Sequence, residues 1–327
     1  KAINIGEEIE NPQIIGYACT WLTWTCCELG LLDEAITYGE RAQEISRSLV
    51  QDHYLYFKSL GGIGYAYVFR GNVRKVFEAG KALQDYGKRH SSIRSIFMGH
   101  LFMGYGHFIA GDFPSAIESC EKGIKVSVDP IYSMAGKLLL GYSHAYEGHF
   151  EEGEDIVQEV ATFCRNFGCE VWETPARMLL GIISVGKGHM SQGIRMIEDT
   201  QKSFLKNKRK SFLTLSESIL GKLYLQIVEG AKPISLTTVA KNIGFILKNV
   251  PSAGRKAEAH FNKTIEMAKE IGARGILGQT YLDLGFLHKE KGKKEEARKY
   301  ISESIQIFEE CGAEAFLKKA KDALGSL

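Results

Sequence analysis

The sequence contains little proline and almost no net charge. Only 6 of its 327 residues are proline, whereas 35 are glycine, a combination that favours many helices separated by glycine turns over a sheet fold. The formal net charge of +2 argues against nucleic acid as a partner. No apolar run reaches the roughly 18 residues of a membrane span, and no signal peptide opens the chain. We therefore expect a soluble, cytoplasmic, helical protein with no nucleic-acid or membrane partner.

Motifs that carry catalytic or metal chemistry are also missing. The seven cysteines are scattered at spacings that match no zinc pattern, so we expect mostly buried, free thiols in a reducing compartment. The glycine-rich stretch at residues 61–64 lacks the lysine of a phosphate-binding loop. No serine or cysteine stands in a recognisable nucleophile context, and no H-E-x-x-H pattern occurs. The sequence predicts no enzyme, no cofactor and no metal site.

A glycine pair with a fixed spacing recurs along the chain. Five glycines are each followed by another glycine seven residues later: Gly64 and Gly71, Gly104 and Gly111, Gly141 and Gly148, Gly181 and Gly188, Gly285 and Gly292. An apolar residue precedes the first glycine of each pair. A small residue often lies five residues after the second glycine, as Gly153 and Gly193 do, where two helices would have to cross closely.

This pattern, together with Ala257-x3-Phe261, resembles the tetratricopeptide repeat family, in which Leu-Gly-x-x-Tyr on a first helix pairs with Ala-x3-Phe on a second. The resemblance implies an all-α fold, a right-handed α-α superhelix of about seven helix-pair repeats. The turn glycines Gly30, Gly71, Gly111, Gly148 and Gly188 recur at intervals of 41, 40, 37 and 40 residues. The standard repeat has about 34 residues, so each helix should be longer by less than one turn.

We expect a single solenoid over residues 1–327. Repeats one to five should occupy residues 13–206, as helix pairs at 13–48, 54–89, 92–127, 131–166 and 172–206. The sixth repeat, 207–271, should hold an inserted helix at about 235–249, because Val239, Ile243, Ile246 and Val250 have helical spacing. The seventh repeat is expected at 272–310, followed by a capping helix within 312–327.

The C-terminal third carries a narrower resemblance. It reads AEAHF from Ala257, LDLG from Leu282 and IFEECGA from Ile307. These strings are similar to the C-terminal tetratricopeptide region of large bacterial proteins that join a class III adenylate/guanylate cyclase domain to a STAND-type ATPase. The resemblance implies that the chain is the regulatory arm of a longer signalling protein, and the start at Lys1 fits a segment of one. No catalytic residue of that family can be assigned to this sequence.

Aromatic residues occupy the positions that line the concave surface in the tetratricopeptide family. We call the first glycine of each pair the signature glycine. The position after it, and the positions three and four residues further on, face this surface. They supply the candidate ligand contacts Trp24, Tyr65, Phe69, Tyr105, Phe108, Tyr142 and Tyr146. Alternatively, the long helices bury these rings between neighbouring repeats.

Such a strip suits a protein or peptide ligand, because rings supply large contact area at low entropic cost. The leading hypothesis is a non-enzymatic protein- or peptide-interaction and sensory module. Two alternatives stay open at this point: a small-molecule-sensing receptor domain and a self-association scaffold that forms a homo-oligomer.

Overall fold

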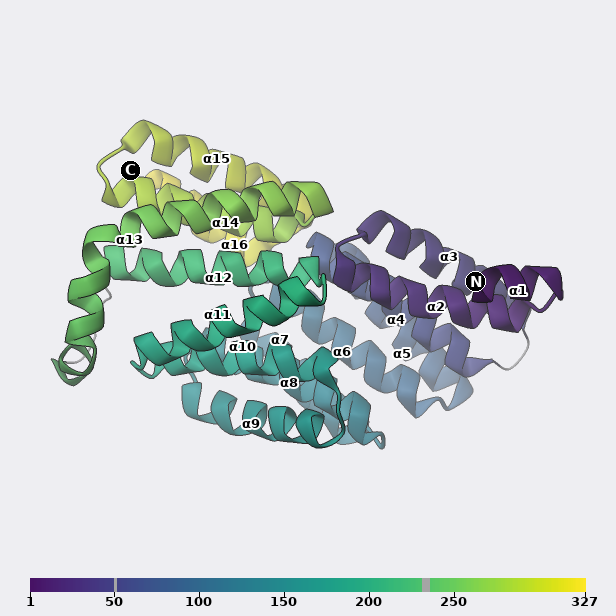
Figure 1. Ribbon diagram of the computed structural model, residues 1–327. Coiled ribbons are helices and arrows are strands. Elements are labelled where there is room, and N and C mark those ends of the chain that lie inside the picture. The colour runs from purple at the N-terminus through teal and green to yellow at the C-terminus, as the bar shows by residue number, and fades with distance from the viewer. Residues whose placement is uncertain (50–51, 231–235) are drawn as a thin grey trace.

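The computed structural model describes residues 1–49, 52–230 and 236–327, with backbone only for 236–248 (Figure 1). These residues form sixteen α-helices and no strand. Seven helix pairs follow one another, so the predicted all-α solenoid is confirmed. The first helices are α2 (Pro12–Leu29), α4 (His53–Arg70), α6 (Ile93–Ala110), α8 (Pro130–Glu147), α10 (Glu170–Gly186), α12 (Lys210–Val228) and α14 (Arg274–Glu290). The second helices are α3 (Leu32–Ser48), α5 (Val73–His90), α7 (Phe113–Val126), α9 (Phe150–Asn166), α11 (Met190–Lys206), α13 (Leu236–Ile271) and α15 (Lys294–Cys311). Helix α1 (Ala2–Glu8) precedes the pairs and α16 (Glu314–Gly325) follows them.

Local sequence explains where many of these helices begin and end. Side chains of Asn, Asp or Ser accept a hydrogen bond from an amide of the first turn, which satisfies a donor that the helix leaves free. They stand at Asn11, Asp52, Asn72, Ser92, Asp112 and Asp129. Glycines with positive φ end α2, α4, α6 and α8, because a left-handed residue there costs glycine little.

Close helix crossing explains the small residue after the turn glycine. A Cβ on Gly193 of α11 would collide with the carbonyl oxygen of Gly181 on α10. Two helices of one repeat therefore touch backbone to backbone at this crossing, as the sequence pattern predicts.

The insertion in the sixth repeat lengthens a helix. The sequence suggested a separate helix at about 235–249, but α13 begins at Leu236 and continues to Ile271 with Pro251 inside it. Figure 1 shows its first part set at an angle to the rest, as a proline inside a helix allows. Val239, Ile243 and Ile246 lie outside the residues whose side chains are described. In the second part, Phe261 is fully buried against Gly221 of α12.

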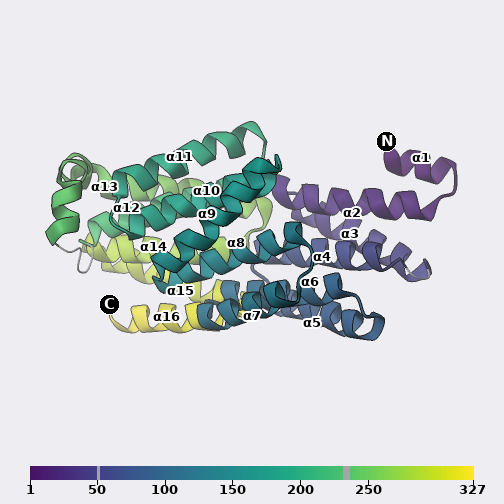
Figure 2. The ribbon, with the colours of Figure 1, turned by 90° about the horizontal axis from the view of Figure 1, so that it is seen from below.

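The repeat array closes on itself after five repeats. The C-terminal ends of α2, α4 and α6 abut the N-terminal ends of α12, α14 and α16 (Figures 1 and 2). A Cβ on Gly71, after α4, would lie 2.6 Å from the Cα of Gly275 in α14. A Cβ on Gly111, after α6, would lie 3.1 Å from the Cβ of Ala315 in α16. We call these end-to-end contacts the closure.

Polar and apolar groups both stabilise the closure. Arg209 forms an ion pair with Glu28, and both side chains are largely buried. Its guanidinium also donates to the carbonyl of Val171 at 2.8 Å. Ser211 Oγ donates to the carbonyl of Cys27 at 2.6 Å. One core cluster joins buried side chains of α2 and α4 to those of α10 and α12, so the first and sixth repeats share a core.

None of the helices within the described ranges is both long and apolar enough to cross a bilayer.

Candidate functional site

The first helices of repeats one to four lie side by side, and their inner faces bring the predicted ligand contacts together. Three of these rings form what we call the Tyr65 cluster. Tyr65 stacks on Trp24 with ring centroids 5.2 Å apart, and it meets Tyr105 at 6.1 Å. Because each ring comes from a different helix, the cluster spans three consecutive repeats, as the repeat register predicts.

The remaining rings form a second group, which we call the Tyr146 cluster. Phe108 lies 6.2 Å from Tyr142 and 5.3 Å from Tyr146, measured between ring centroids. Phe113 joins them at 5.1 Å from Tyr146, and it reaches Phe316 of α16 at 6.4 Å. The inner aromatic face therefore runs from α2 to α8 and meets the last helix of the chain.

Phe69 has a different environment from the other six candidate contacts. It is buried, with 8% of its surface exposed, and its ring lies 5.5 Å from Phe212 of α12. Phe69 therefore packs in the core that forms the closure, against a helix of the sixth repeat and not against a neighbouring repeat. The other six candidates are partly exposed.

The tyrosines of the inner face combine partial exposure with strong desolvation. Burial raises the pKa of the Tyr65, Tyr105 and Tyr142 phenols well above the usual value near 10. All three side chains still have some contact with solvent. Protein atoms therefore surround most of each ring, while a part of each ring still faces solvent.

The inner aromatic face ends in a lysine surrounded by rings, which we call the Lys58 site. The Nζ of Lys58 lies 4.8 Å from the ring centroids of both Trp21 and Trp24, and 5.4 Å from that of Tyr132. The indole nitrogen of Trp24 donates to the Lys58 carbonyl at 3.0 Å, which fixes one wall of the site. Trp21 is 56% exposed, so the site opens to solvent.

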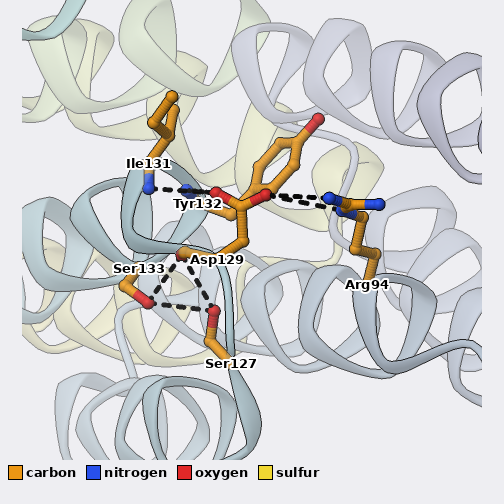
Figure 3. Close-up of polar contacts among 6 residues, drawn as sticks. All are labelled: Arg94, Ser127, Asp129, Ile131, Tyr132 and Ser133. Carbon is orange, nitrogen blue, oxygen red and sulfur yellow. Dashed lines mark hydrogen bonds and ion pairs between the residues drawn. The ribbon is translucent and has the colours of Figure 1, made fainter.

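The start of helix α8 holds Tyr132 in the Lys58 site (Figure 3). Asp129 Oδ1 accepts hydrogen bonds from the amides of Ile131 and Tyr132, at 3.0 and 3.4 Å. Arg94 of α6 pairs with the other carboxylate oxygen at 3.3 Å. Figure 3 shows the Tyr132 ring beside the ion pair of Asp129 and Arg94. The carboxylate that borders the site is therefore already bound on both oxygens.

Charged side chains gather on the inner faces of α12, α14 and α16, in what we call the charged basin. Lys222 lies 5.6 Å from the ring of Tyr146, so the basin adjoins the aromatic face. Asp283 is 8% exposed, and burial raises the pKa of its carboxyl despite the attraction of Lys222 and Lys319. Its carboxylate makes no hydrogen bond or ion pair with any residue that the structure describes. The basin thus holds acidic and basic groups that interact without direct contact.

A cleft of about 1140 Å³ lies elsewhere, between α5, α6 and the start of α16. Phe77, Met103 and His107 form its floor, and charged side chains of α5 line its edge. It contains none of the predicted contacts. We favour the inner face as the candidate site, because rings from four repeats converge there.

The histidine, cysteine and acidic side chains of the described residues lie apart from one another. No three His, Cys, Asp or Glu side chains within the described ranges lie close enough to share a metal ion. Histidines at one repeat position contact separate partners: His107 lies 4.9 Å from Phe77, and His288 lies 5.3 Å from Tyr300. All seven cysteines are free, and six of them are buried.

Sequence reasoning missed part of the site, namely Trp21, Lys58 and Tyr132. Trp21 precedes Trp24 by three residues, and Lys58 precedes Tyr65 by seven, so helical periodicity places both on the faces already selected. The repeat signature marks ligand-facing positions only from its glycine onward, whereas these three residues lie nearer the helix starts. Trp21 and Lys58 lie about one and two turns before the predicted contacts of their helices, and Tyr132 lies nearly three turns before Tyr142.

Comparisons with known proteins identify the fold. No family model and no curated protein sequence matches the chain. A Rap protein complexed with competence and sporulation factor has a similar structure, at 10% identity and a TM-score of 0.62, covering 93% of this chain and 80% of that one. NprR in complex with its cognate peptide NprX is similar at 11% identity and a TM-score of 0.59, covering 93% and 81%. The apo form of RapI follows at 9% identity and a TM-score of 0.53, covering 95% and 99%. These neighbours are tetratricopeptide-like helical repeat proteins, and this chain shares their fold.

Proposed function

We propose that the protein is a non-enzymatic sensory module that binds a peptide on its inner aromatic face. The observation that carries the proposal is the row of partly exposed rings from Trp24 to Tyr146, which continues to the open Lys58 site. Two proteins of similar fold are known with ligands: NprR with its cognate peptide, and a Rap protein with competence and sporulation factor.

The aromatic rings of the inner face can provide contact area to an extended peptide at low entropic cost. Aromatic side chains have few rotatable bonds, so they provide contact area while losing little conformational entropy on binding. The rings come from four parallel helices and therefore form a row of separate contacts, which suits a ligand with several side chains. A peptide meets that requirement better than a compact metabolite.

Tryptophan fluorescence tests this proposal, because Trp21 and Trp24 lie at the open end of the face. The purified protein is titrated with pools of short synthetic peptides. We expect binding by the native chain and a loss of about 30-fold in affinity for Trp21→Ala, the usual range for an exposed aromatic anchor. Leu205→Ala is the matched control, since Leu205 is 68% exposed on α11, outside the inner face. Absence of binding to any pool would refute the proposal.

Two other functions predict different results. A small-molecule receptor would show a raised melting temperature in a screen of metabolites, with no response to the peptide pools. A self-association scaffold would show a mass that rises with concentration in light scattering.

We also propose that peptide binding regulates a cyclase or ATPase domain in a longer cytoplasmic protein. The sequence resemblance of residues 210–327 motivates this role, and the comparisons with known proteins give no further support for it. Sequencing the full-length gene product tests it directly, and a product without such domains would refute it.

A further inference from the structure

Lys58 is a half-buried cation that has no counter-ion among the described residues. Its Nζ is surrounded by the rings of Trp21, Trp24 and Tyr132, and it makes no hydrogen bond or ion pair with any described residue. Cation–π contacts compensate part of the lost hydration, but a ring face replaces only some of the hydrogen bonds that water gives to an ammonium group. Burial lowers the pKa of Lys58 to about 8. The site is therefore short of negative charge.

The groups around Lys58 do not supply that charge. On its own helix, α4, Tyr54 lies one turn away, and across the site Tyr132 presents a phenol. Asp129 borders the site, but Arg94 and two backbone amides already bind its carboxylate. These contacts hold Asp129 at the start of α8, as Figure 3 shows. No described residue gives the Lys58 ammonium a negative partner, so an incoming anion would be its first counter-ion.

The position of Lys58 indicates which part of a ligand reaches it. Lys58 lies beside Trp24, where the row of rings begins, whereas the charged basin adjoins Tyr146 at the far end. A peptide that follows the row therefore places one of its two ends at Lys58.

We infer that Lys58 binds the C-terminal carboxylate of the peptide ligand, and that Trp21, Trp24 and Tyr132 enclose its last side chain. This inference rests on the proposed peptide-binding function and gives the peptide a direction, with its C-terminus at the start of the aromatic row. The carboxylate pairs with the ammonium in an apolar surrounding, where a charge-assisted hydrogen bond is strong.

Matched peptide pools test the inference. Acetylated short peptides of the same composition are prepared as free acids and as C-terminal amides, and affinities are measured by tryptophan fluorescence. For the native protein we expect the acid pool to bind about 30-fold more tightly than the amide pool, the usual contribution of a hydrogen bond to a charged group. Lys58→Met should abolish the difference between acid and amide, and Lys58→Arg should keep most of it. Lys122→Met, which removes an exposed lysine of α7, should leave it unchanged.

The ratio between acid and amide is read within one protein preparation, so partial unfolding of a variant does not alter it. Equal binding of both pools by the native protein overturns the inference and leaves the peptide function intact. A Lys58-dependent preference for internal Asp or Glu also overturns it, since a side-chain carboxylate would then be the ligand. Tight binding of acetylated single amino acids would assign the site to a small carboxylic acid instead. No binding of any probe refutes the proposed function as well.

Discussion

The closure of the superhelix predicts a large difference between two chemically identical substitutions. Gly71 and Gly148 occupy the same position of repeats two and four, with φ of 75° and 88°. Both end a first helix in the left-handed conformation. A Cβ on Gly148 would meet nothing within 4 Å, whereas a Cβ on Gly71 would lie 2.6 Å from the Cα and the N of Gly275. Gly148→Ala therefore measures the backbone strain alone, and Gly71→Ala adds the contact with α14.

The expected magnitudes follow from these two effects. An alanine in the left-handed region costs roughly 1 kcal/mol relative to glycine, so Gly148→Ala should lower the free energy of unfolding by about that amount. At Gly71 the new methyl group meets backbone atoms, which cannot rotate away as a side chain would. Overpacking of this kind costs about 1–3 kcal/mol more. We expect Gly71→Ala to lower the free energy of unfolding by about 3 kcal/mol in total.

Urea denaturation followed by circular dichroism at 222 nm gives the comparison, with both variants and the native protein in parallel. Small-angle scattering adds a second measurement, because opening of the closure would increase the radius of gyration of Gly71→Ala alone. Equal destabilisation of the two variants, with unchanged scattering, would refute the end-to-end packing of α4 on α14.

Further predictions concern buried charges and thiols. Arg209→Ala leaves Glu28 buried without its partner, so it should lower the free energy of unfolding by about 3–5 kcal/mol. Lys122→Ala breaks an exposed ion pair and should lower it by under about 0.5 kcal/mol. Chemical denaturation compares the two variants, and similar losses would contradict the closure. Burial raises the pKa of Asp283 in the folded protein above its value in the unfolded chain. At a pH above the folded-state pKa, the ionised carboxylate therefore destabilises the fold. This destabilisation is lost as the pH falls from the folded-state pKa to the unfolded-state pKa. Asp283→Asn should therefore raise the free energy of unfolding at pH 7 by about 1 kcal/mol and give no gain near pH 4, and a gain that is independent of pH would contradict this reasoning. Thiol titration of the native protein should modify one cysteine quickly and the other six only on unfolding, because Cys169 alone is not buried. Fast reaction of several thiols in the native protein would contradict the packing. Fast reaction of any thiol in Cys169→Ser would contradict it as well.

The fold could be read from the sequence where the signals are local. Helix α2 begins after Asn11, whose side chain caps it, and ends at Gly30 in the left-handed conformation. Helix α4 has Asp52 and Gly71 in the same roles. Such signals depend on a few neighbouring residues, so a repeat can be recognised without knowledge of the whole structure. The insertion of the sixth repeat was harder to read, because α13 continues through Pro251.

The candidate site was predictable only in part. The position after the signature glycine identified Trp24, Tyr65 and Tyr105, and these rings do lie together on three adjacent helices. The same reasoning included Phe69, which the closure buries against Phe212. Periodicity shows which side of a helix a residue occupies. It does not show what covers that side.

The sequence by itself determined the class of secondary structure, the helix-pair repeat and the face that carries the aromatic residues, because each depends on contacts within one repeat or between neighbours. Tertiary structure alone decided where the array closes. That contact depends on the small rotation from each repeat to the next, summed over five repeats, and it joins Glu28 to Arg209, 181 residues further along the chain. The same summed geometry turned Phe69 into a core residue, and it left Lys58 at the open end of the inner face with no ion-pair partner in the described part of the chain.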